Sequence, residues 1–175
     1  GNGTIPAVDS RRLQLARAAG SATVKLCEKD IRPRDIVNEY SLTNAFVVDV
    51  ALGGSTNSVL HLMAIASEAG ISFPLSRVNE ISRNTPHLTK MSPAGQNHIE
   101  DLDFAGGIPA VMRELKRHLR LDAVTVSGKT IGQNIAGARV NDRKVIRTEA
   151  HPYSPRGGLS ILLGNLAPEG AVVKS

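Results

Sequence analysis

The chain has 175 residues, of which 41% are hydrophobic and 21% carry a charge; these proportions are ordinary for a soluble globular protein and argue against intrinsic disorder. Lysine and arginine outnumber the acidic residues by 21 to 16, yet three Phe, two Tyr and no Trp leave little with which to stack nucleic-acid bases, so we expect no nucleic-acid partner. No apolar run approaches the roughly 18 residues of a membrane span, and we expect no membrane partner either.

The first predicted element is a helix over residues 10–29, capped by Asp9 or Ser10. Small and apolar residues recur at helical spacing along one side of it, namely Leu13, Ala16, Gly20, Val24 and Cys27. We therefore expect the single cysteine to be a buried core residue. One thiol forms no internal disulfide, and iron–sulfur clusters need several thiolates.

Residues 42–52 predict a second, almost wholly apolar helix that runs into a Gly-Gly pair, and a buried helix follows from Thr56 to Gly70. Glycine lets the backbone pass close to a neighbour or ligand, and a hydroxyl or amide side chain can cap the helix start. Helix starts attract carboxylates and phosphates. The turn is therefore our first candidate for a substrate pocket, with a plain N-cap in a core as the alternative, and its residues are Gly53, Gly54, Ser55, Thr56 and Asn57.

A short amphipathic helix over residues 75–84 and a Pro-containing loop lead to a second pair, Gly106-Gly107, which opens a helix with Pro109 in its first turn. Carboxylates just before this pair suit acid–base work or Mg²⁺ binding, and we take Glu100 and Asp101 as further pocket candidates. The alternative is a helix start decorated with acids to suit its dipole. Two Gly-Gly turns aimed at one point would bind an anion well, but the sequence does not show that they converge.

Much of the basic excess lies in residues 113–120, within the helix expected after the second Gly-Gly pair. The apolar stripe of that helix comprises Ile108, Val111, Met112, Leu115 and Leu119. Because the basic residues fall largely on the opposite side, we interpret them as a solvated helix face. A short strand over residues 123–126 and a short helix over 129–136 are expected next.

The pattern changes after Asn141 to short strands separated by Pro and Gly turns, at residues 144–147, 159–163 and 171–173. We place a domain boundary between 140 and 150, with one domain over residues 1–145 and the start of another over 146–175. The last two strands predict a β-hairpin, which is marginal in water without a second layer. We expect that layer to come from outside this sequence, which leaves the hairpin mobile or docked on another chain.

Six segments together resemble the dihydroxy-acid dehydratase family in order and near spacing. They are GNGTIPA (1–7), KDIRPRD (29–35), NAFVVDVALGGSTNSVLHLMAIASEA (44–69), TPHL (85–88), HIEDLDFAGGIPAVM (98–112) and YSPRGGLSILLGNLAPEGAVVK (153–174). The Gly-Gly-Ser-Thr-Asn and Ala-Gly-Gly loops are shared with phosphogluconate and sugar-acid dehydratases. The first and last segments favour the branched-chain enzyme.

The resemblance implies an α/β fold, with residues 1–145 as the C-terminal part of a three-layer α/β/α domain and 146–175 as the first strands of a β-rich swivelling domain. It implies a hydro-lyase of branched-chain amino acid biosynthesis that converts 2,3-dihydroxy-3-methyl acids to 2-oxo acids by loss of water. It further implies a homodimer for the full-length enzyme and a cytoplasmic location, organellar if eukaryotic. The alternatives are a sugar-acid or 6-phosphogluconate dehydratase, and a non-catalytic binding module of the same fold.

The resemblance also implies an iron–sulfur cluster and Mg²⁺, with ligands outside this segment. The catalytic serine of the family likewise has no counterpart here. We therefore expect an internal piece of a longer enzyme that contains neither a catalytic residue nor a metal ligand and is inactive alone.

Overall fold

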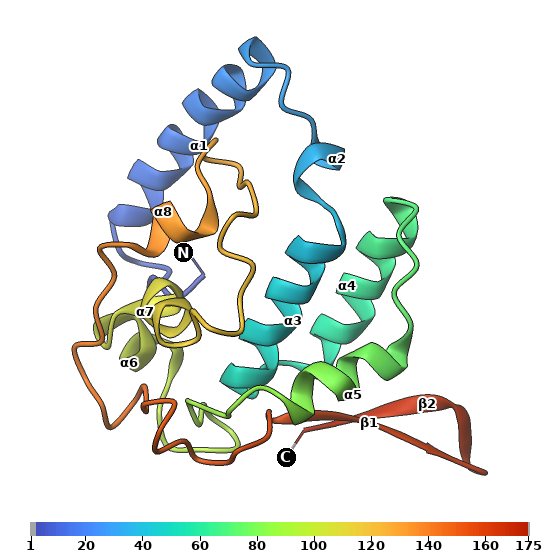
Figure 1. Ribbon diagram of the computed structural model, residues 1–175. Coiled ribbons are helices and arrows are strands. Elements are labelled where there is room, and N and C mark those ends of the chain that lie inside the picture. The colour runs from blue at the N-terminus through green and yellow to red at the C-terminus, as the bar shows by residue number, and fades with distance from the viewer. Residues whose placement is uncertain (1–2, 175) are drawn as a thin grey trace.

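Helices make up most of the regular structure, and the two strands come last, as the ribbon of the computed structural model shows (Figure 1). The structure describes residues 3–174. Its elements are α1 (Arg11–Glu28), α2 (Pro33–Ile36), α3 (Glu39–Leu52), α4 (Thr56–Glu68), α5 (Leu75–Arg83), α6 (Ile99–Phe104), α7 (Gly107–Glu114), α8 (Ile131–Ile135), β1 (Leu159–Gly164) and β2 (Ala167–Lys174). This mixture of helices with a two-stranded antiparallel sheet is compatible with the α/β class.

The centre of the core is α3, and the sequence defines both of its ends. Asn38 caps the start by accepting a hydrogen bond from the backbone N–H of Ser41, and the left-handed Gly53 ends the helix. Phe46 and Val50 have no exposed surface, and the Phe46 ring stacks on that of Phe73 with 5.1 Å between the ring centres. The helix therefore presents a fixed C-terminal end to the turn that follows it.

The β-hairpin forms as predicted, with β1 and β2 antiparallel and Ile161 opposite Val172. It is not without a second layer, however, because β1 packs on α5 of the same chain. The side-chain amide of Asn79 donates to the Ile161 carbonyl at 2.8 Å and accepts from the Ile161 N–H at 2.7 Å. The expectation that cover comes only from elsewhere is thus wrong for the first half of β1, whereas the far half, with Leu162 and Leu163, is exposed.

Three predicted segments have a different structure. The helix α7 ends at Glu114, and residues 115–118 form turns, although Leu115 and Leu119 are buried as the stripe predicted. Residues 123–126 form only one isolated bridge, from Val124 to Thr130, and residues 144–147 are not a strand. Burial was predicted correctly for the first segment, but the period of a short apolar run does not distinguish a strand from a buried turn.

The helix α1 forms as predicted but is not buried. None of its residues is buried, and Cys27 is exposed, which corrects the expectation of a core cysteine. Figure 1 shows this helix along one side of the molecule. The apolar stripe of α1 lies away from the core cluster. The contacts that attach this helix to the rest of the molecule are polar and lie close to its N-terminal end.

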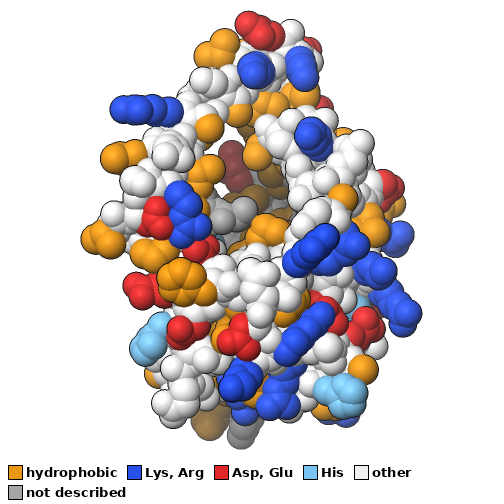
Figure 2. Space-filling model, turned by 90° about the vertical axis from the view of Figure 1, so that its left-hand side faces the viewer, with side chains coloured by type: hydrophobic (Ala, Val, Ile, Leu, Met, Phe, Trp, Pro, Cys, Tyr) orange, Lys and Arg blue, Asp and Glu red, His pale blue; other side chains and the backbone are white. Residues whose placement is uncertain are grey.

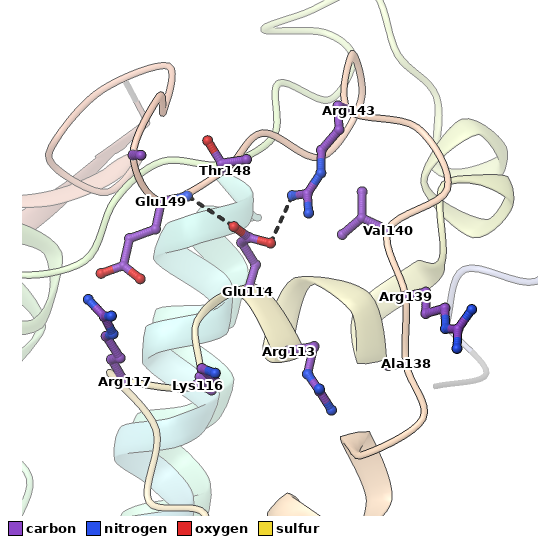
Figure 3. A pocket seen from close by; sticks show the side chains of 11 residues that line it. Arg113, Glu114, Lys116, Arg117, Ala138, Arg139, Val140, Arg143, Thr148 and Glu149 are labelled. Atoms are coloured by element: carbon purple, nitrogen blue, oxygen red, sulfur yellow. Dashed lines mark hydrogen bonds and ion pairs between the residues drawn. The ribbon is translucent and has the colours of Figure 1, made fainter.

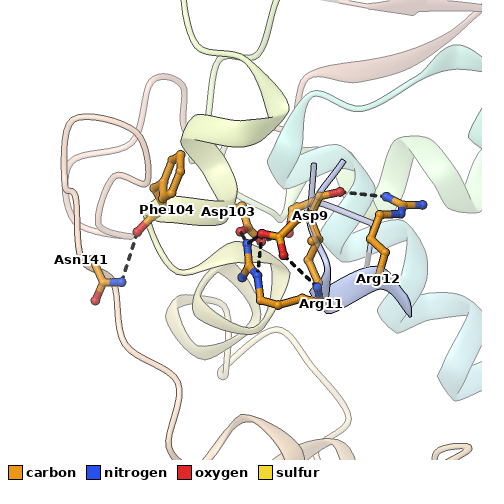
Figure 4. A network of polar contacts seen from close by, with 8 residues as sticks. Asp9, Arg11, Arg12, Asp103, Phe104 and Asn141 are labelled. Carbon is orange, nitrogen blue, oxygen red and sulfur yellow. Dashed lines mark hydrogen bonds and ion pairs between the residues drawn. The ribbon is translucent and has the colours of Figure 1, made fainter. Parts of the chain in front are cut away.

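That attachment is a network around Asp103, which Figure 4 shows. The carboxylate of Asp103 accepts hydrogen bonds from the Thr4 hydroxyl and from the Arg11 guanidinium, both at 2.8 Å, and Arg11 also pairs with Asp9. These hydrogen bonds with Arg11 and Thr4 keep the pKa of Asp103 below its usual value against the opposing effect of desolvation. The network ties the start of α1 to α6.

Candidate functional site

The Gly53-Gly54 pair forms the tight turn that the sequence predicted. Gly53 has φ = 58°, in the left-handed region, and the Gly54 N–H donates to the Asp49 carbonyl at 3.0 Å. Neither glycine has room for a side chain, since a Cβ on Gly53 would collide with the His87 ring and one on Gly54 with the Asp49 carboxylate. The backbone of Gly158 also packs on this turn, because a Cβ there would lie 2.7 Å from the Gly53 Cα.

His87 lies under the turn and is only 4% exposed. Its backbone exchanges hydrogen bonds with the 153–154 segment, yet its Nε2 atom has no hydrogen-bond partner among residues 3–174. Burial lowers the pKa of His87, and the nearby positive charges of Lys90 and Lys174 lower it further. The imidazole is therefore neutral near pH 7, with one ring nitrogen against the glycine turn.

Asp49 is the second unusual group at the turn. It sits in the last turn of α3, where Oδ1 accepts a hydrogen bond from the Ser58 hydroxyl at 3.0 Å and Oδ2 is buried without a partner in the described chain. Burial raises the pKa of Asp49 to about 6, although the Ser58 hydrogen bond and the Lys174 charge oppose that shift. Unsatisfied buried polar atoms are rare, and shifted pKa values gather at functional sites.

The three polar residues after the glycines are exposed at the start of α4. Ser55 is the N-cap, since its hydroxyl accepts a hydrogen bond from the Asn57 N–H at 3.1 Å. The side chains of Thr56 and Asn57 have no hydrogen bond to other described residues and face solvent. The expected buried helix is instead half-exposed, with Val59 and Ala66 as its buried residues.

One of the two acidic candidates, Asp101, serves another contact. The Asp101 carboxylate accepts from the His98 N–H at 2.7 Å and so caps α6, as the alternative interpretation anticipated, and Glu100 is exposed. At the second glycine pair, a Cβ on Gly106 would collide with the Arg139 carbonyl. Within residues 3–174, the atoms that crowd this pair include none of those that crowd the first pair, so the two turns do not pack on each other directly. Pro109 is the third residue of α7.

Sequence reasoning missed Asp49, His87 and Gly158. A signal existed for Asp49, which is the one acidic residue in the apolar run between Tyr40 and Ser67. An unpaired carboxylate in such a run is costly to bury and therefore informative. His87 carried no comparable signal, because its position under Gly53 depends on tertiary packing.

Comparison with known proteins gives consistent similarities over the whole chain. Residues 1–134 match the family described as dihydroxy-acid/6-phosphogluconate dehydratase N-terminal, and residues 144–175 match its C-terminal counterpart. Proteins named dihydroxy-acid dehydratase are similar to it: that of Dehalococcoides mccartyi strain CBDB1 is 59% identical over 99% of this chain, and that of Aquifex aeolicus 57% over 100%. The chain spans 31% and 32% of those two proteins, which agrees with the expectation of a piece of a longer chain.

Proposed function

The chain belongs to the dihydroxy-acid/6-phosphogluconate dehydratase family, and on that premise we propose that it is part of a dihydroxy-acid dehydratase. Such a hydro-lyase converts 2,3-dihydroxy-3-methyl acids to 2-oxo acids in branched-chain amino acid biosynthesis. The observation that carries this proposal is 56–59% identity, over essentially the whole chain, to proteins with that name. The family name also covers 6-phosphogluconate dehydratases, and a sugar-acid or phosphogluconate substrate is the alternative.

Within that enzyme, we assign to the Gly53–Asn57 turn the task of holding the substrate rather than transferring its protons. The N-terminal end of α4 carries partial positive charge that suits a carboxylate, and the exposed Thr56 and Asn57 side chains can hydrogen-bond to hydroxyl groups. No side chain from 53 to 57 titrates near neutrality. Asp49 and His87 lie behind the turn and fix its shape.

The iron–sulfur cluster and Mg²⁺ belong, in this proposal, to parts of the enzyme outside this chain. The residues present do not fit either group: residues 3–174 contain no cluster of three or more His, Cys, Asp or Glu that could hold a metal, and Cys27 stands alone and exposed. Four further features are part of the same proposal and rest on the family resemblance. They are the three-layer domain, the swivelling domain, the homodimer and the cytoplasmic or organellar location.

No helix of the described chain has the length and apolar character needed to cross a membrane.

The proposed activity is tested with the full-length protein that contains this sequence. We expect it to form 2-oxoisovalerate from 2,3-dihydroxyisovalerate and to leave 6-phosphogluconate unchanged, measured by trapping the 2-oxo acid. The 175-residue chain is the matched control and should show neither turnover nor iron–sulfur absorbance after reconstitution. Turnover of 6-phosphogluconate alone would assign the alternative substrate, and turnover by the 175-residue chain would place catalytic groups within it.

The positioning role of the turn predicts a mild effect for Ser55→Ala. Loss of the cap should lower the free energy of unfolding by about 1 kcal/mol and leave part of the turnover in the full-length enzyme. Thr130→Ala is the control, because Thr130 caps α8 in the same way without contact with the turn. Complete loss of turnover in Ser55→Ala, with the fold and cluster content intact, would assign a direct chemical role to the serine.

A further inference from the structure

A basic pocket of about 800 Å³ lies between the C-terminal end of α7 and the loop that follows α8 (Figure 3). Its positively charged side chains come from two segments; in Figure 3, Arg143 points toward Glu114 and Arg139 points away from α7. Arg113, Lys116 and Arg117 lie on the α7 side, and Arg139 and Arg143 lie on the loop side. Neither the Gly53–Asn57 turn nor its neighbours contribute to the lining.

The pocket exists because α7 ends early. If the helix had continued to residue 120, these cations would have lain on a solvated helix face. Instead the chain turns after Glu114, and the buried Leu115 and Leu119 anchor that turn against the core. The turn brings Lys116 and Arg117 into a concave surface, which concentrates their field more than a convex helix face does. Lys and Arg side chains also gather on the lower right of the face in Figure 2.

The two acidic residues of the pocket are already engaged. Glu114 accepts from the Arg143 guanidinium at 2.8 Å and from the Glu149 N–H at 3.2 Å, and Glu149 lies 3.1 Å from the His118 ring nitrogen. These contacts hold the α7 side and the loop side of the pocket in place. Arg113 adds a further tie by donating to the Ile135 and Ala136 carbonyls at the end of α8.

Four of the five cations have no acidic partner in the described chain. Arg113 donates to backbone carbonyls, and Lys116, Arg117 and Arg139 remain. Gathering like charges in one hollow costs free energy that a bound anion would offset. Guanidinium groups match phosphoryl oxygens in geometry as well as charge. The volume is that of a small-molecule pocket and exceeds what one carboxylate fills. The lining includes no aromatic ring on which a nucleic-acid base could stack.

We propose that this pocket binds a small anion carrying two or more phosphoryl groups, at a site separate from the glycine turn. Cationic residues come from both walls, so we expect a ligand with two phosphoryl groups to contact both walls and a single phosphate to contact one. The inference is independent of the proposed dehydratase activity, since it rests on the charges and shape of this pocket alone.

Inorganic pyrophosphate is the probe, titrated into the 175-residue chain by calorimetry at low and at physiological salt. We expect one saturable site per chain, with orthophosphate binding at least tenfold more weakly. Arg117→Ala and Arg139→Ala should each weaken pyrophosphate binding about tenfold, the effect of losing one charge-assisted hydrogen bond. Arg17→Ala, on exposed α1, removes the same charge elsewhere and should change nothing. Circular dichroism checks that each variant is folded.

Equal weakening by all three variants would show that only net charge matters and would overturn the proposal. A short single-stranded RNA that bound more tightly than pyrophosphate, with a salt dependence indicating many phosphate contacts, would also overturn it in favour of a nucleic-acid surface. Weakening confined to the two pocket variants, together with the preference for pyrophosphate, would establish the site.

Discussion

Gly53→Ala is expected to lower the free energy of unfolding of the chain by about 3 kcal/mol, measured by denaturant titration. An alanine at φ = 58° costs about 1–2 kcal/mol because its Cβ approaches the following carbonyl. The new methyl group also collides with the buried His87 ring, and overpacking of this kind costs about 1–3 kcal/mol more.

Gly70→Ala is the matched control for that experiment. Gly70 also has a left-handed φ, of 72°, but a Cβ there meets nothing within 4 Å. The free energy of unfolding of Gly70→Ala should therefore fall only by the cost of the left-handed conformation. This cost is about 1 kcal/mol, after allowance for the lower entropy of the unfolded alanine variant. If the two variants lost equal stability, the packing of His87 against the turn would contribute nothing and the assigned shape of the site would be wrong.

Asp49→Asn should stabilise the chain by up to about 3 kcal/mol above pH 7, relative to its effect below pH 4. The folded pKa of Asp49 is raised to about 6 from 3.8, so the folded state binds the proton more tightly and loses stability as the pH rises through that interval. At higher pH the half-buried carboxylate is charged, at a cost of up to about 3 kcal/mol for a shift of this size. Asparagine keeps an oxygen for the Ser58 hydroxyl and carries no charge, but its NH2 group replaces the unpartnered Oδ2, which reduces the gain at every pH by the same amount.

The pH dependence distinguishes the removal of the buried charge from a gain in stability with another cause. The gain from Asp49→Asn should vanish below about pH 4, where the carboxylate is neutral in both states. His87 acts in the opposite direction, because its lowered pKa makes stability fall as the pH drops below 6.5. The Asp49→Asn variant should show that loss without the opposing contribution of Asp49. Asp122→Asn, at an exposed position, is the control. A gain from Asp49→Asn that did not vary with pH would exclude the buried charge as its cause.

Helix boundaries were predictable where a local cap sets them. The left-handed Gly53 and the capping Ser55 define their boundaries from neighbouring residues alone, and the structure has the turn where the sequence placed it. Cys27 shows the limit of the same reasoning. Helical spacing identified an apolar stripe on α1. Whether such a stripe is buried depends on which elements pack against it, and the residues of this stripe are exposed.

The remaining misses have the same cause. Val145 and Ile146 are buried as their apolar character suggests, yet in an irregular segment whose next residue, Arg147, hydrogen-bonds to the distant Leu88 carbonyl. The candidate site likewise has features that the local sequence predicts and features that depend on tertiary packing. The glycine turn was visible in the sequence, whereas the unpartnered atoms of Asp49 and His87 arise only from the packing of segments far apart in the chain.

The Asn79 amide restricts how the two-stranded sheet can grow. Antiparallel pairs alternate between residues that point their N–H and C=O groups at the partner strand and residues that point them away. Both groups of Ile161 are bonded to Asn79, which lies where the backbone of a neighbouring strand would otherwise lie. Exposed strand edges are templates for unwanted pairing between molecules, and here one side chain blocks that template at Ile161. A third strand, from this protein or another, can therefore pair along the full length of the sheet only beside β2.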